Sequence, residues 1–141
     1  MKRFVCVVAA LSLSLTFAGS ASALPPLPKY VGEYYAAKPE YAKFSEAFKG
    51  LMMKCDTCHK PGADKKAKGH GLNDFGEAMH KVLKHKEFLE ADKAKFDDPK
   101  MADLAKKLVA EALVAAEAAK KDGGKTYGEL MKAGMLPGTN P

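Results

Sequence analysis

The side chains best suited to chemistry lie within five residues, in the run Cys55-Asp56-Thr57-Cys58-His59. Cysteine thiols and imidazole bind metal ions, and paired thiols also form disulfides. A disulfide between Cys55 and Cys58 would close too short a loop to constrain much of the chain. The pair therefore predicts a chemical role rather than a structural cross-link.

The order Cys-x-x-Cys-His is the attachment signature of a c-type haem. A tight turn would bring both thiols to one edge of a porphyrin, where they form thioethers with its vinyl groups. His59 would follow beneath the ring and offer a nitrogen to the iron. The sequence thus predicts one covalently bound haem c, attached at Cys55 and Cys58, with His59 as the proximal iron ligand.

Two other kinds of site use similar residues. A thioredoxin-like redox pair has the same cysteine spacing, but it belongs in a βαβ setting, and this chain has no run with strand periodicity. A zinc site would need a fourth ligand such as His70. Adjacent Cys58 and His59 rarely reach the same tetrahedral ion, so the pattern favours haem.

The second axial ligand of the iron is less clearly marked. Met101 follows Pro99 downstream of the motif, although it also fits the apolar stripe of a helix. His80 is the alternative ligand, and Met135 could bind from the C-terminal tail. An open position is the remaining option. Methionine–histidine ligation raises the reduction potential, whereas an open position would permit gas binding or catalysis.

The N-terminus has the pattern of a secretory signal peptide, residues 1–23. Lys2 and Arg3 precede an apolar run, which ends in the small residues Ala21-Ser22-Ala23. The run is short for a bilayer span, so we expect cleavage after Ala23 rather than a retained anchor. The mature chain would then be exported, most simply to the periplasm, without a membrane anchor. Export suits the motif, because c-type haem is attached after translocation.

The charge balance is mildly basic. The full chain has 23 Lys and Arg against 17 Asp and Glu, a net charge of +6, which falls to +4 without Lys2 and Arg3. The two signs are well mixed, which argues against nucleic acid as a partner. A basic surface could attract a redox partner protein with an acidic docking surface, although lysines that serve only solubility explain the same composition.

The pattern of apolar residues predicts an all-α fold. We expect an extended, Pro- and Tyr-rich entry segment over residues 24–38, followed by one haem domain over residues 39–141. Apolar residues at helical spacing predict about four helices in that domain. Their expected ranges are 39–54, 73–90, 98–121 and 126–133, the last one starting at a capping box of Thr126 and Glu129.

The chain resembles the class I monohaem cytochromes c. In that family a small and an apolar residue precede the first cysteine on an N-terminal helix, and here Ala47 and Leu51 stand eight and four places before Cys55. The resemblance is specific over residues 47–59 and architectural elsewhere. It implies a small cytochrome c-like helical domain around one haem, with Cys55 and Cys58 as the attachment points and His59 as the proximal ligand.

The function expected from the motif and the resemblance is one-electron transfer through Fe(II) and Fe(III), without catalysis. Two alternatives stay open. With an open sixth coordination position, the domain could be a haem sensor or a weak peroxidase. It could also be the cytochrome subunit of a larger oxidoreductase.

Overall fold

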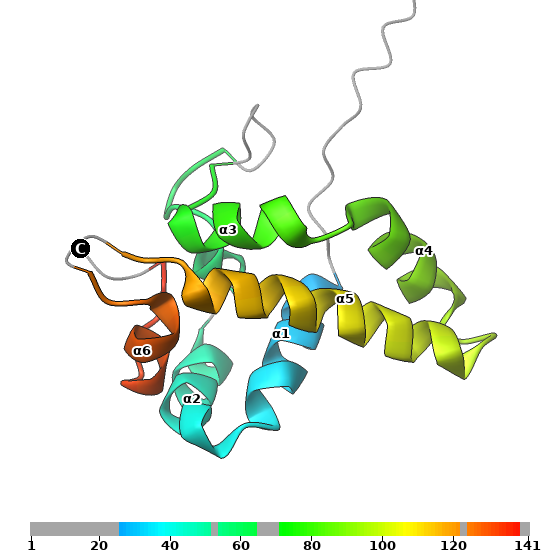
Figure 1. Cartoon of the computed structure of the whole chain (residues 1–141), viewed down its shortest axis with the longest axis horizontal. Helices are drawn as coiled ribbons and strands as arrows, with labels where there is room; N and C mark the ends of the chain where they lie inside the picture. The colour runs from blue at the N-terminus through cyan, green and yellow to red at the C-terminus, as the bar shows by residue number, and fades with distance from the viewer. Residues whose placement is uncertain (1–25, 52–53, 65–70, 122–123, 139–141) are drawn as a thin grey trace, which may run out of the picture.

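Helix α5 (Pro99–Ala118) is the central element of the structure, a computed structural model that describes residues 26–51, 54–64, 71–121 and 124–138. The Asp98 side chain caps the helix by accepting a hydrogen bond from the backbone nitrogen of Lys100, at 2.9 Å. Proline in the first turn and many alanines favour helix here. Figure 1 shows α5 running along the molecule, with the other helices packed on both sides.

The described residues contain no strand, so the expected all-α class is confirmed. Two isolated bridges, His59 with Leu72 and Lys120 with Thr126, pair short loop segments instead. Besides α5, the helices are α1 (Leu27–Ala36), α2 (Ala42–Gly50), α3 (Asp74–Val82), α4 (His85–Ala94) and α6 (Tyr127–Lys132), with 3-10 turns η1 (Pro39–Tyr41) and η2 (Lys54–Thr57).

The helices pack around α5 in two groups. Helices α3 and α4 lie along one side of α5, whereas α1 and α2 lie on the other side, and α6 packs between α2 and the C-terminal end of α5 (Figure 1). Aromatic rings fill the space between the groups. The core includes Tyr35, Phe44, Phe75, Phe88, Leu113 and Met131, all fully buried.

The expectation of an extended segment over residues 24–38 was wrong, because residues 27–36 form helix α1. Pro28 lies in the first turn, where the missing N–H costs nothing. Tyr30, Val31 and Tyr35 are buried against the core, and their spacing matches one face of a helix. Prolines taken as a sign of extended chain therefore mark a helix start.

The helix expected over residues 73–90 is two helices, with a break at Leu83 and Lys84. In one straight helix, Phe88 would lie about 220° around the axis from Phe75. Both side chains are fully buried, and both α3 and α4 pack against α5. The break lets each half turn its own apolar face toward α5, so a count of about four helices was too low.

The remaining expected helices agree better with the structure. The first begins as the turn η1 and ends at Gly50 rather than residue 54. The long helix begins at Pro99 as expected, and the capping box of Thr126 and Glu129 starts α6. The expected signal peptide, residues 1–23, lies outside the described residues. Among those described, no helix has the length and hydrophobicity needed to cross a membrane.

One polar contact ties α1 to α4. The Tyr30 hydroxyl donates a hydrogen bond to Asp92 Oδ1 at 2.9 Å, and Lys95 donates to the same oxygen. Burial alone would raise the pKa of Asp92, but the hydrogen bonds from Lys95 and Tyr30 outweigh it and lower the pKa. The folded chain therefore favours the ionised carboxylate.

Candidate functional site

The Cys-x-x-Cys-His run forms the tight turn that the sequence predicts. Turn η2 contains Cys55, whose carbonyl oxygen accepts hydrogen bonds from the backbone nitrogens of Cys58 at 3.1 Å and His59 at 3.0 Å. The two cysteines are not joined by a disulfide, and both are partly exposed. The thiols and the imidazole thus follow one another within a single turn.

The start of helix α3 holds this turn in place through Asn73. The Asn73 amide nitrogen Nδ2 donates a hydrogen bond to the carbonyl oxygen of Thr57 at 3.0 Å. The backbone nitrogen of Asn73 donates another to the carbonyl oxygen of Cys58, also at 3.0 Å. Its side-chain oxygen accepts from the backbone nitrogen of Gly76 at 2.8 Å, which caps α3. Asn73 is buried, so one side chain both caps a helix and fixes the motif.

Two glycines allow the backbone to approach the turn closely. A Cβ atom on Gly76 would overlap the carbonyl oxygen of Cys58, and one on Gly138 would overlap that of Asp56. Gly76 belongs to α3, whereas Gly138 belongs to the segment after α6. The turn is therefore enclosed by helix α3 and by the C-terminal segment, which the sequence analysis had treated only as a tail.

Cys58 packs against the hydrophobic core. Burial, and secondarily the neighbouring Cys55, raises the pKa of the Cys58 thiol to about 12. The free Cys58 side chain is thus an uncharged thiol at neutral pH. An uncharged thioether would suit the same half-apolar position, so the residues present fit covalent haem attachment.

The predicted distal ligands lie on different elements of the fold. Met101 lies in the first turn of α5, beside α4, at the opposite end of the molecule from the start of α3 (Figure 1). His80 lies in the last turn of α3, where its Nδ1 atom is 3.1 Å from Nε2 of His85. Met135 is exposed and precedes Gly138 by three residues. His70 lies outside the described residues.

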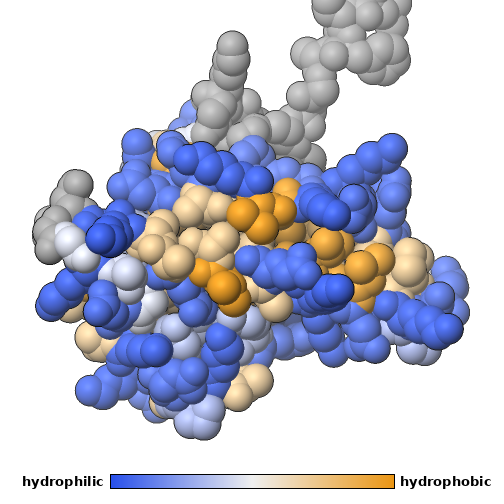
Figure 2. Space-filling view, viewed as in Figure 1, coloured by the Kyte–Doolittle hydropathy of each residue, from blue (hydrophilic) through white to orange (hydrophobic). Residues whose placement is uncertain are grey.

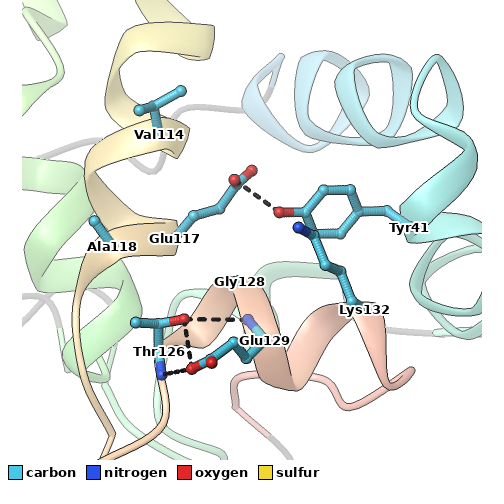
Figure 3. A pocket seen from close by; sticks show the side chains of 8 residues that line it. All are labelled: Tyr41, Val114, Glu117, Ala118, Thr126, Gly128, Glu129 and Lys132. Carbon is cyan, nitrogen blue, oxygen red and sulfur yellow. Dashed lines mark hydrogen bonds between the residues drawn. The ribbon is translucent and has the colours of Figure 1, made fainter.

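A second polar site, which the sequence analysis missed, lies between α5, α6 and η1 (Figure 3). The Tyr41 hydroxyl donates a hydrogen bond to Glu117 Oε2 at 2.8 Å, and Lys38 Nζ lies 3.8 Å from Glu117 Oε1. Burial, reinforced by Glu117, raises the pKa of Tyr41. An open cavity of about 280 Å3 is lined by Tyr41 and Glu117 together with Val114, Ala118, Thr126, Gly128, Glu129 and Lys132.

Figure 2 shows one face of the molecule, on which hydrophilic residues surround a band of hydrophobic ones. The band follows α3 and α5. Exposed apolar side chains on these helices include Val82, Leu104 and Val114.

Comparison with known protein families, with curated proteins and with solved structures finds no match. Within the described ranges, no three His, Cys, Asp or Glu side chains lie close enough together to hold a metal ion. The described residues therefore offer no zinc centre made of Cys55, Cys58 and His59 alone.

Proposed function

We propose that the chain is an exported monohaem c-type cytochrome that carries single electrons. The observation that carries this proposal is the turn at residues 55–59, where two unlinked thiols and an imidazole follow one another and are held from both sides. A disulfide or a zinc centre would not need this order of residues. A haem would, because both thioethers and the proximal ligand come from one short segment.

The chain's own residues have separate tasks in this proposal. Cys55 and Cys58 form the two thioethers, and His59 binds the iron. Asn73 fixes the turn by its hydrogen bonds to the carbonyl oxygens of Thr57 and Cys58. The haem supplies the Fe(II)/Fe(III) couple when it is bound. The protein tunes that couple through the axial ligands, burial and nearby charge.

A haem sensor or weak peroxidase is the second candidate. Met101, the first candidate for the distal ligand in the sequence analysis, lies at the α4 end of α5 and away from the motif. This placement favours the sensor or peroxidase. A carrier needs a sixth ligand, whereas a sensor or peroxidase needs an open position. A place as a subunit of a larger oxidoreductase is compatible with either coordination state.

The test of attachment is expression of the full precursor in a host that matures c-type cytochromes. We expect a coloured protein whose mass exceeds that of the chain from residue 24 by one haem, which also tests cleavage after Ala23. Replacing Cys55 and Cys58 with serine should give a colourless protein. The matched control is Cys6→Ser, which removes the third cysteine and should leave the haem in place. A colourless wild-type protein would overturn the proposal.

Carbon monoxide separates the carrier from the sensor. A low-spin ferrous protein whose spectrum does not change under carbon monoxide supports the carrier. A high-spin ferrous protein that binds carbon monoxide supports the sensor or peroxidase. In the low-spin case, Met101→Ala, His80→Ala and Met135→Ala are compared, and the variant that becomes high-spin identifies the distal ligand.

A further inference from the structure

The junction between α3 and α4 brings two histidines together. His80 lies in the last turn of α3, and His85 is the first residue of α4. Their ring centroids are 4.3 Å apart, and a hydrogen bond of 3.1 Å joins His80 Nδ1 and His85 Nε2. In one continuous helix, residues five apart would point about 140° away from each other. The break at Leu83 and Lys84 is what makes the two imidazoles face each other.

We propose that His80 and His85 bind a divalent transition-metal ion of the zinc and nickel class, at a site separate from the haem. Imidazole is a preferred ligand of these ions. With metal–nitrogen bonds of about 2.0–2.1 Å, two ligand nitrogens are about 2.9 Å apart at a right angle and about 3.3 Å apart in a tetrahedron. The observed separation of 3.1 Å lies between these two values, so an ion could take the place of the hydrogen-bonding proton with little movement of the two nitrogens.

The position of the pair suits a metal ion from solvent. His80 is exposed and His85 is partly exposed, so water can complete the coordination. Of the lysines next to the pair in the sequence, Lys84 lies 3.5 Å from the carboxylate of Glu87, which partly offsets its charge. Mg²⁺ and Ca²⁺ prefer oxygen ligands and should not compete.

The test is a calorimetric titration of the haem-loaded mature protein with Zn²⁺. Loaded protein is used because free Cys55 and Cys58 could themselves bind zinc. Should the chain carry no haem, the same titration is performed on the Cys55→Ser, Cys58→Ser variant, so failure of the proposed function leaves this test intact. We expect one ion per chain.

The variants make the assignment specific. His80→Ala and His85→Ala should each weaken Zn²⁺ binding at least tenfold, about 1.4 kcal/mol. Neither side chain is in the core, so both variants should fold. The matched control is His70→Ala, which should bind Zn²⁺ as the wild type does. The ion binds only the native state, in which α3 and α4 bring the two histidines together. Saturating Zn²⁺ should therefore raise the midpoint of thermal unfolding of the wild type but not of the two variants.

Three results would overturn the proposal. The first is the absence of a saturable heat with Zn²⁺ or Ni²⁺ at millimolar concentration. The second is equal binding by the wild type and both variants. The third is a change of the haem spectrum from low-spin to high-spin in His80→Ala alone, which would make His80 a ligand of the haem iron instead.

Discussion

Replacing Gly76 with alanine tests whether close packing between α3 and the motif holds the candidate site together. A Cβ atom at this position would overlap the carbonyl oxygen of Cys58, which belongs to the backbone and has no rotamer that avoids the contact. Either α3 or the turn at residues 55–59 must move. The same substitution at Gly50 meets nothing within 4 Å and is the matched control.

The expected cost comes from two sources. Overpacking a tight contact costs about 1–3 kcal/mol. Moving the turn also weakens the hydrogen bond from Asn73 N to the Cys58 carbonyl, at 3.0 Å, and the cap from Gly76 N to Asn73 Oδ1, at 2.8 Å. Each such bond contributes about 0.5–1.5 kcal/mol. We therefore expect Gly76→Ala to lower the free energy of unfolding by about 2–6 kcal/mol.

Urea unfolding followed by helical circular dichroism measures this difference. Gly50→Ala should be neutral or stabilising by up to about 1 kcal/mol, because alanine is the better helix former. If haem attaches as proposed, Gly76→Ala should also lower the yield of haem-loaded protein. Equal stability of Gly76→Ala and Gly50→Ala, within about 0.5 kcal/mol, would show that the motif is not packed against α3 in this way.

Three further perturbations follow from the polar contacts. Asn73→Ala removes the cap of α3 and the side-chain hydrogen bond to the Thr57 carbonyl oxygen. It should lower the free energy of unfolding in urea by about 1–3 kcal/mol. Tyr41→Phe leaves the Glu117 carboxylate without its hydroxyl donor and should cost about 1–3 kcal/mol, whereas Tyr34→Phe, the control, should cost less. The lowered pKa of Asp92 means that its carboxylate stabilises the fold above about pH 4 and loses this effect as the pH falls through the folded pKa. Unfolding free energies measured between pH 5 and pH 2 should therefore fall more steeply for the wild type than for Asp92→Asn, and parallel curves would contradict the pKa shift.

The sequence predicted local features better than tertiary ones. The starts of α5 and α6 were visible in Asp98-Pro99 and in the pair Thr126 and Glu129, because caps and first-turn prolines act within a few residues. The turn of the motif was visible for the same reason. The role of Asn73 toward Thr57 was not visible, because a hydrogen bond between residues 16 positions apart leaves no periodic signal.

Helix α1 was missed although its signal was present. Tyr30, Val31 and Tyr35 have helical spacing, but the prolines before them suggested extended chain. A proline in the first turn is equally compatible with a helix, so the apolar spacing should have decided the assignment.

The break between α3 and α4 can be predicted from a shift of the apolar stripe from one side of a continuous helix to the other. No glycine or proline interrupts residues 77–98, and a search for breakers therefore finds one helix. Phe75, Met79 and Leu83 form one stripe, whereas Phe88 and Ala91 belong to another on nearly the opposite side. A straight helix would leave one of these stripes in solvent, so burying both against α5 requires a turn between them. That turn also places His80 against His85. The position of the proposed metal site thus depends on how the core residues of both helices pack against α5.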